Sequence, residues 1–398
     1  MATQSGGKSK EEDYKGNKII IGSDNSTYAS VLKDYLLIAT DKNTLQEAIN
    51  TTQGQPSLAS KPGAEELLTK GVDVKNPIAQ VYMMDYADTI QKLMNTSSSE
   101  VTIPPSTLKQ IKNLKSFVVG IGVEDAGVRM KGVVNMSPDA PKLSYKPVPG
   151  KVVSQFPAET LAMVSGGNIS QSWAQGLEQV KDDPDTQKAL NEIRQTVKTT
   201  VDVDLDKDVF SWMDGEFGMA LIPSDRGILA QVGFGGIFVF DTSDRKTAEA
   251  TLSKLDKLAK ENSVLIQERD VQGKKVTEWN SPFGSLLGHG WLDDDSMFIA
   301  LGGPMIDVAT SKPNQPLENS DNFKAIAGNL PKQNLGYFYV DMDKTMTLVN
   351  RFSALAQTPI PPEPAAVLNS IKGIGMTSTQ VGDSSGQFDM LLALKKTK

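Results

Sequence analysis

One phrase occurs twice in this 398-residue chain, and the repetition constrains its architecture more than any other feature. Residues 103–116 read IPPSTLKQIKNLKS, and residues 360–373 read IPPEPAAVLNSIKG. The two copies begin 257 residues apart, which is far longer than a solenoid repeat of about 20–50 residues. The spacing therefore predicts a large structural unit that is used twice.

Further matches support this interpretation because they follow in the same order. They are DYKGNKI (13–19) with DVQGKKV (270–276), DYLLIAT (34–40) with DSMFIAL (295–301), GQPSL (54–58) with NQPLE (314–318), and AQVYMMDYADTIQKLMN (79–95) with LGYFYVDMDKTMTLVNR (335–351). The offset between copies varies only from 256 to 261 residues. A chance origin would not preserve both order and spacing.

These matches predict the domain organisation. Residues 1–12 are expected to form a flexible tail, residues 13–145 the first repeat unit (B), and residues 270–398 the second B unit. Residues 146–269 have no matching copy, and we expect this segment (A) to form a larger domain with the unit after it. The order B-A-B would arise from A-B-A-B by loss of the first A segment. We therefore expect the sequence to be a fragment.

The local patterns predict an α+β fold. Residues 242–262, TSDRKTAEATLSKLDKLAKEN, place apolar residues at helical spacing, with Thr242 or Ser243 as the expected N-cap. A hairpin is expected around Gly273, and residues 286–302 read as two strands joined by an acidic turn. Hairpins dominate, and helices do not strictly alternate with strands. The sequence thus predicts antiparallel sheets with helices packed on one face, built from a duplicated unit.

Composition excludes several classes of protein. The 41 Lys and Arg residues are outnumbered by 48 Asp and Glu residues, giving a net charge of −7, whereas nucleic-acid binding requires a basic surface. The chain has no cysteine, so disulfides, thiolate nucleophiles and sulfur-ligated metals are excluded. With His289 as the one histidine, a His-rich metal site is excluded too.

Residues 156–173, FPAETLAMVSGGNISQSW, and residues 203–223, VDLDKDVFSWMDGEFGMALIP, together with residues 233–255, resemble the cyanobacterial DUF3352 family of uncharacterised proteins. Members of that family look like larger proteins with an N-terminal membrane anchor, which implies an extracytoplasmic location in the periplasm or thylakoid lumen. This N-terminus has no apolar signal segment. A cytoplasmic location is expected if the chain is complete, and a membrane-proximal one if an anchor is missing. The resemblance supplies no catalytic residues.

Three aspartates in residues 202–208, DVDLDKD, form a weak candidate metal site. Asp202, Asp204 and Asp206 have the spacing of the first three ligands of a calcium loop. Lys207 stands where the loop needs glycine, and Met213 stands where it needs a bidentate glutamate. We expect a solvated turn and helix start here, with weak divalent-cation binding as the alternative.

A second set of polar residues comes from the repeat itself. Asp85 and Asp341 occupy equivalent strand-to-helix junctions, and Thr89 and Thr345 follow one helical turn later. Helix capping is the structural interpretation. In the functional alternative, both junctions would face a shared groove. Other candidate motifs are expected to be structural: GGKS at 6–9 lacks the first glycine of a phosphate loop.

We expect a non-enzymatic, soluble binding or scaffold protein with an unidentified protein partner and no cofactor. An alternative is a carrier that holds a lipid or other amphiphile in an apolar cradle between helices and sheet, with methionines in its walls. A third hypothesis is a metal-dependent hydrolase that uses aspartates. It has less support, because three consecutive carboxylates at residues 293–295 would point in different directions along a strand or turn.

Overall fold

The computed structural model of the chain describes residues 9–60 except 24 and 34, residues 72–137 except 85–89 and 91–110, residue 140, and residues 145–396 except 359. The chain forms two compact units, residues 1–69 (unit 1) and residues 70–398 (unit 2).

Unit 1 is a four-stranded antiparallel sheet with one helix on its inner face. Its elements are β1 Lys10–Tyr14, β2 Asn17–Ile21, β3 Tyr28–Leu32, β4 Tyr35–Ala39, α1 Lys42–Thr52 and the 3₁₀ turn η1 Leu58–Ser60. Lys15 and Gly16 both have positive φ angles, as a tight two-residue hairpin between β1 and β2 requires. Alternating strand residues and the buried side of α1 form a small core of Ile19, Ile21, Leu32, Leu45 and Ile49.

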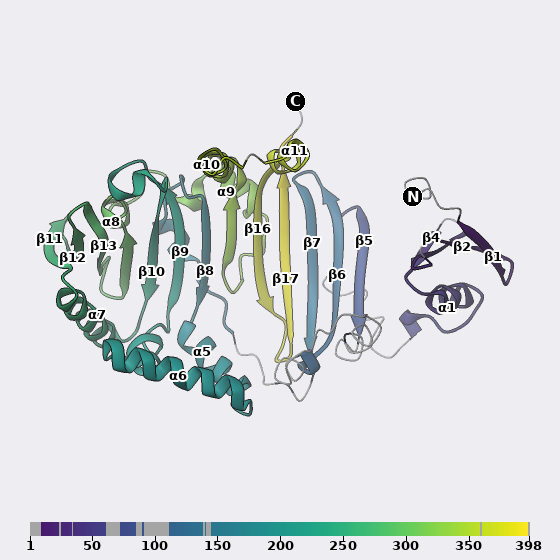
Figure 1. The fold of residues 1–398 in the computed structure, drawn as a ribbon, viewed down its shortest axis with the longest axis horizontal. Coiled ribbons are helices and arrows are strands. Elements are labelled where there is room, and N and C mark those ends of the chain that lie inside the picture. Colours follow the sequence, from purple (N-terminus) through teal and green to yellow (C-terminus); the bar gives the residue numbers. More distant parts are fainter. Residues whose placement is uncertain are drawn as a thin grey trace. The chain divides into compact units, whose positions relative to one another are not determined.

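Unit 2 contains one antiparallel sheet of 13 described strands (Figure 1). From one edge to the other the strands are β11 Leu265–Val271, β12 Lys274–Ser281, β13 Gly284–Trp291, β14 Ser296–Leu301, β10 Phe234–Asp241, β9 Glu216–Pro223, β8 Ala162–Gly167, β15 Tyr337–Asp341, β16 Ile371–Gln380, β17 Ser385–Leu394, β7 Gly127–Met136, β6 Leu114–Glu124 and β5 Pro77–Met84. The predicted hairpin around Gly273 is confirmed, and so is the strand pair β13–β14 with its acidic turn.

The order of the strands is mirrored about the pair β17–β7. On one side of this pair lies the meander β17-β16-β15, and on the other side the meander β7-β6-β5. Met390 of β17 lies opposite Met130 of β7 in an antiparallel register. A local twofold axis perpendicular to the sheet relates two neighbouring antiparallel strands. If the two meanders are equivalent, this axis relates them, and the same face of each meander lies on the same side of the sheet.

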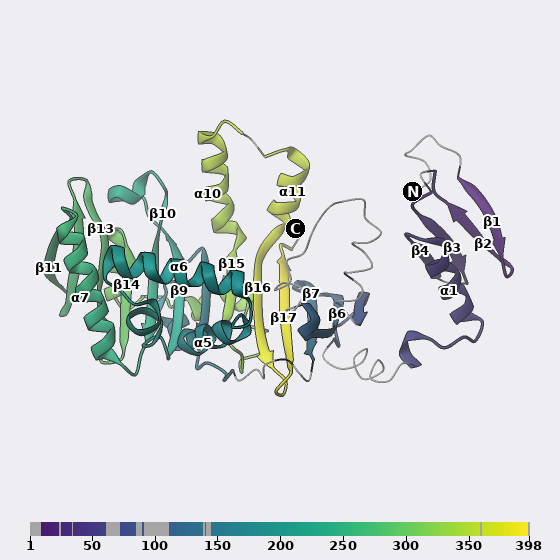
Figure 2. The same cartoon turned by 60° about the horizontal axis from the view of Figure 1, so that its bottom comes forward.

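Helices lie on both faces of this sheet (Figures 1 and 2). Side chains of α8 and α9 join the large buried core on one face, which we call the back face. Side chains of α7 pack on the opposite, front face. The helices and short turns are η2 Lys151–Gln155, α5 Ile169–Gln179, α6 Pro184–Val201, the π-helical turn η3 Leu205–Phe210, η4 Gly227–Ala230, α7 Arg245–Glu261, α8 Gly303–Thr310, η5 Leu317–Asn319, α9 Asp321–Ile326, α10 Met342–Leu355 and α11 Pro362–Ser370.

The α+β class with antiparallel sheets is confirmed. The helix expected in residues 242–262 is present as α7, but its N-cap is Asp244, whose carboxylate accepts the amide of Thr247, and not Thr242 or Ser243. The side chain of Thr242 instead accepts the Asp244 amide. No helix in the described part of the chain is long and apolar enough to cross a membrane.

The elements described in the first predicted B unit have counterparts in the same order in the second, which also contains α9, α10 and α11. Each runs through four strands, a helix and a 3₁₀ turn, and each later supplies three strands of the large sheet. This order is what the duplication interpretation predicts. The division into compact units falls after residue 69, inside the first B unit.

Candidate functional site

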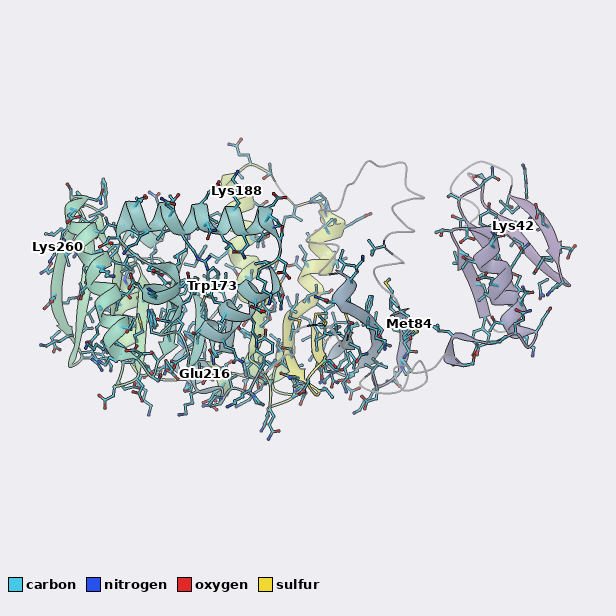
Figure 3. The ribbon with its side chains drawn as sticks, turned by 90° about the horizontal axis from the view of Figure 1, so that it is seen from below. Lys42, Met84, Trp173, Lys188, Glu216 and Lys260 are labelled. Carbon is cyan, nitrogen blue, oxygen red and sulfur yellow. The ribbon has the colours of Figure 1, made fainter. Side chains whose placement is uncertain are left out.

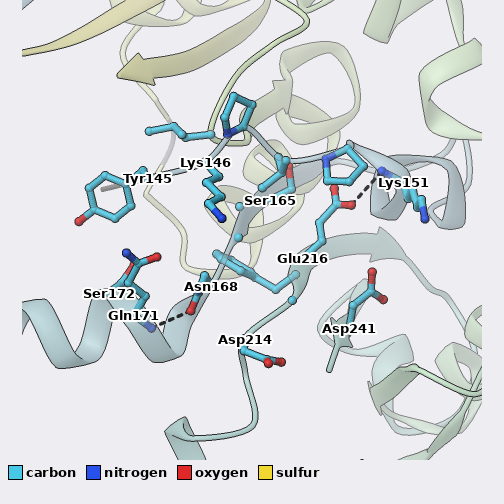
Figure 4. Close-up of a pocket in the computed structure, with 18 of the residues that line it drawn as sticks. Tyr145, Lys146, Lys151, Ser165, Asn168, Gln171, Ser172, Asp214, Glu216 and Asp241 are labelled. Atoms are coloured by element: carbon cyan, nitrogen blue, oxygen red, sulfur yellow. Dashed lines mark hydrogen bonds between the residues drawn. The ribbon is translucent and has the colours of Figure 1, made fainter. Parts of the chain in front are cut away.

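A polar pocket of about 910 Å³ opens at the ends of β8, β9 and β10 (Figure 4). The start of α5 forms one wall, where Asn168 caps the helix and accepts the amide of Gln171 at 2.8 Å. The segment before η2 contributes Lys146, and the backbone at Lys151 forms the opposite wall. Carboxylates from two adjacent strands, Glu216 and Asp241, also line the pocket.

Glu216 is the most unusual residue of this pocket. Its side chain is buried, and one carboxylate oxygen, Oε2, accepts the backbone amide of Lys151 at 3.0 Å. The other oxygen, Oε1, is buried with no hydrogen-bond partner in the described residues. Burial raises the pKa of Glu216, and the nearby charge of Asp241 raises it further. Glu216 can therefore hold a proton more readily than a surface glutamate.

Asp241 is held at the end of β10. Its carboxylate accepts the hydroxyl of Ser296 on the neighbouring strand β14. Burial also raises the pKa of Asp241. Two carboxylates with raised pKa values in one pocket could exchange protons with a bound molecule. In the described part of the chain, no group of three or more acidic, histidine or cysteine side chains is placed to hold a metal ion.

The second candidate site is the front face of the large sheet. Directly opposed residues of antiparallel strands point to the same side, and an unbroken row of apolar side chains crosses eight strands on this side. We call it the apolar row: Phe238, Met219, Val164, Phe338, Met376, Met390, Met130 and Ile121. Its second to fifth members, from β9, β8, β15 and β16, are 36–38% exposed.

Two positions along these strands, a parallel second row is also apolar apart from one glycine. It consists of Leu301, Gly236, Leu221, Ala162, Val340, Ile374, Leu392, Val128 and Val123. On the back face, by contrast, the neighbours Met163, Ala220, Tyr339 and Leu391 are at most 3% exposed. Strands that are apolar on both sides are typical of sheets covered on both faces. Here one face is covered and the other is partly open.

The predicted aspartate site is not assembled as a metal site. Asp202 is exposed and pairs with Lys198, while Asp204 caps η3 by accepting the amides of Asp206 and Lys207. Asp206 accepts hydrogen bonds from Trp173 at 2.6 Å and Arg194 at 3.0 Å. Burial opposes ionisation, but these two hydrogen bonds lower the pKa of Asp206 overall. These hydrogen bonds join α5, α6 and η3, and Figure 3 labels Trp173 of α5.

The junction residues of the second B unit have a structural role. Asp341 is fully buried and is the N-cap of α10, accepting the Lys344 amide, as the capping interpretation predicts. Its other oxygen, Oδ2, accepts a hydrogen bond from the side-chain amide of Asn322 and pairs with the ammonium of Lys344, both at 2.7 Å. The hydroxyl of Thr345 is buried and has no partner in the described residues. Asp85 and Thr89 lie outside the described residues, so the shared groove stays a prediction.

His289 lies on β13 with its side chain buried. Its Nε2 is 2.8 Å from a carboxylate oxygen of Asp256 on α7, which also accepts the indole N–H of Trp279. Burial opposes ionisation of Asp256, but these hydrogen bonds lower its pKa. The cluster therefore fastens α7 to the sheet.

Sequence reasoning missed both candidate sites. Glu216 was part of a quoted motif, DGE before an apolar strand, but nothing in the sequence places Asp241 beside it. The apolar row needs the register of eight strands, which a sequence alone does not give. A usable signal was the apolar character of both strand faces in segments such as residues 216–223.

Comparison with known proteins gives the family. Residues 1–394 match the family model described as a protein of unknown function, DUF3352. The chain belongs to the DUF3352 family. No curated protein and no solved structure matches it. The DUF3352 match covers both B units and the A segment, so pocket and apolar row both lie within the family region.

Proposed function

We propose that this DUF3352 protein is a non-enzymatic binding protein that docks a protein partner on the apolar row of its large sheet. The observation that carries the proposal is the row itself: eight consecutive strands present apolar side chains to a partly open face. Contiguous exposed apolar surface of this kind is typical of interaction sites.

The shape of the surface favours a macromolecule over a small ligand. Eight strands spaced about 4.8 Å apart make the row about 34 Å long, close to the length of a 20-residue helix. Small-molecule sites instead enclose most of their ligand. Four of the row's side chains are methionines, whose flexible thioethers adapt to a partner surface. A polypeptide laid along the row would cover it.

Methionines also favour a second candidate function, the carrier of a lipid or other amphiphile. Met130, Met219, Met376 and Met390 form half of the row, and thioethers contact hydrocarbon as readily as peptide. We prefer the docking of a protein partner, because the face that carries the apolar row is partly open and does not enclose a small ligand. An extracytoplasmic location in a cyanobacterium, near a membrane, is part of the proposal and rests on the resemblance of the family motifs.

The test compares two glutamate substitutions in protein purified from its own organism. Met376→Glu places a charge in the middle of the row, where it would be desolvated by a partner. Leu265→Glu is the matched control, since Leu265 on the edge strand β11 is 65% exposed and lies outside the row. Native mass spectrometry and size-exclusion chromatography measure what remains bound, and thermal unfolding confirms that both variants are folded.

We expect wild type and Leu265→Glu to carry a stoichiometric protein partner, and Met376→Glu to bind it about tenfold more weakly. A bound molecule with the mass of a lipid, present in wild type and lost in Met376→Glu, would favour the carrier function over protein docking. If both variants retain the same partner equally, the apolar row is not the docking site.

A further inference from the structure

Unit 1 has an exposed apolar surface on one side of its sheet, whereas its small core and α1 lie on the other side. Directly opposed residues of antiparallel strands point to the same side. On the exposed side, these residues of β2, β3 and β4 form a surface that we call the outer patch: Ile20, Ala29, Val31, Leu36 and Ile38. Val31, Leu36 and Ile38 are 64%, 63% and 58% exposed.

The second B unit contains an equivalent surface, and there a helix covers it. By the sequence match between β4 and β14, Leu36 corresponds to Met297 and Ile38 to Ile299. Met297 is fully buried in a cluster with side chains of α7, and Ile299 packs against the same cluster. In unit 1, the described helix α1 packs on the opposite side of the sheet. The repeated surface is therefore seen once with a helix on it and once without.

The register of the strands extends the comparison to β3. Val31 lies opposite Leu36, and Trp291 lies opposite Met297. Val31 therefore occupies the position of Trp291. In the second B unit, Arg245 of α7 stacks on this indole, with its guanidinium carbon 4.1 Å from the ring centroid. Both strands that carry most of the outer patch thus have counterparts in contact with α7.

One difference between the two surfaces specifies the chemistry of the missing helix. His289 lies opposite Ile299 and is 2.8 Å from a carboxylate oxygen of Asp256 on α7. In unit 1, Ala29 lies opposite Ile38 and so takes the place of the histidine. A carboxylate at the position of Asp256 would be buried here without its imidazole partner, which is costly. A helix that fits the outer patch therefore has an apolar residue at this position.

Charges at one edge of the outer patch add a second requirement. Glu11 of β1 lies opposite Ile20, and Asp13 lies opposite Lys18, so these charged side chains lie on the same side of the sheet as the patch. Lys18 pairs with Glu11 at 2.9 Å. Two carboxylates and one ammonium leave this edge acidic overall. Complementary charge favours a helix with Lys or Arg along the flank that faces β1.

We propose that the outer patch docks one amphipathic helix of the α7 kind, supplied from outside residues 1–398. This helix has an unbroken apolar stripe against β3 and β4 and a basic flank towards β1. The sequence of α7 lies in the A segment, which has no matching copy within the 398 residues. The proposal concerns unit 1 and not the apolar row, so it stands or falls independently of the proposed function.

Because the chain has no cysteine, a single introduced cysteine reports on its own position without background. The test introduces Leu36→Cys and Ile38→Cys on the outer patch. Tyr35→Cys is the matched control, since Tyr35 is the neighbouring residue of β4, is 72% exposed and points to the opposite side of the strand. Maleimide labelling rates are measured on the 398-residue chain purified from a foreign host and on protein made in its own organism. Thermal unfolding confirms that the three variants are folded.

In the chain from the foreign host, all three cysteines should label rapidly. In material from its own organism, the cysteines at 36 and 38 should label about tenfold more slowly than the one at 35, because only the unoccupied patch reacts. Equal labelling at the three positions in this material would overturn the proposal.

A photo-crosslinker on the thiol at position 36, followed by peptide mass spectrometry, identifies what covers the patch. The crosslinked peptide should have apolar residues at helical spacing and Lys or Arg along one flank, and it should match no part of residues 1–398. Crosslinks to residues 70–398 of the same chain, to a second copy, to a lipid or to a segment without this pattern would overturn the proposal.

Discussion

At the scale of single residues, the buried carboxylate of Glu216 makes the folded state sensitive to pH. Burial raises the pKa of Glu216 in the folded protein above its ordinary value of 4.5. Between pH 4.5 and this raised pKa, the folded protein therefore binds more protons than the unfolded one. The free energy of unfolding contributed by this group therefore falls as the pH rises through that range. Above the raised pKa the full penalty of burying the charge is present.

We expect Glu216→Gln to remove this contribution. Relative to wild type, the variant should be more stable at neutral pH, and the difference should shrink as the pH approaches 4.5. Urea unfolding at a series of pH values measures the difference. Glu318→Gln, at an exposed position on η5, is the control and should show no such trend. A pH-independent difference for Glu216→Gln would show that its ionisation is not linked to folding.

A second residue-scale feature is the ion pair at the centre of the mirrored strand order. The Nε and one Nη of Arg129 on β7 donate to the two oxygens of Asp389 on β17 at 2.8 and 2.7 Å, and both side chains are at least nine-tenths buried. Removing one partner of a buried pair leaves the other charge without compensation.

Asp389→Ala should therefore lower the free energy of unfolding by about 3–5 kcal/mol, measured by urea unfolding of unit 2. The double variant Arg129→Leu, Asp389→Leu should recover most of that loss, since it removes both charges of the pair and leaves only Glu124, whose side chain is 19% exposed, without its Arg129 partner. A single-variant loss no larger than that of an exposed pair, about 0–1 kcal/mol, would contradict this account.

At the scale of elements, the contact of α9 with β16 depends on a glycine. A Cβ atom built on Gly373 would lie 2.2 Å from Ile326 Cδ1 on α9 and 2.5 Å from the carbonyl oxygen of Val340. Gly373→Ala should thus cost about 1–3 kcal/mol through overpacking. Gly386→Ala on β17 is the control, since its nearest neighbour is 4.0 Å away. Equal unfolding midpoints for the two variants would show that α9 shifts without cost.

Element types were predictable where the pattern is local. The hairpin at Gly273 and the helix α7 follow from turn chemistry and helical periodicity. The N-cap of α7 was misplaced because Thr242, Ser243 and Asp244 all have capping side chains, and the local backbone path decides between them. The pairing of β8 with β15, whose partners are 174–178 residues apart, is a tertiary contact without a local signal. Both candidate sites depend on such contacts.

At the scale of the whole molecule, the sequence predicts a duplication but not how its copies pair. Similar offsets between matched phrases predict two related units, whereas the pairing of β7 with β17 is a tertiary contact without a local sequence signal. The division after residue 69 was not predicted, because it falls inside the first predicted B unit and not at one of its ends.

The division into two compact units predicts two unfolding steps. The buried core of unit 1 is small, and small domains bury a smaller fraction of their surface. Unit 1 should therefore unfold first. Hydrogen exchange with mass spectrometry at increasing urea should show peptides from residues 10–52 exchanging before those of the large sheet.

Two matched substitutions separate the steps. Leu45 on α1 and Ile326 on α9 are both at most 1% exposed, one in each core. Truncation of such a side chain costs about 2–5 kcal/mol, so Leu45→Ala should lower only the first transition and Ile326→Ala only the second. If either variant shifts the exchange of all peptides together, the two units unfold in a single cooperative step, which would contradict the prediction.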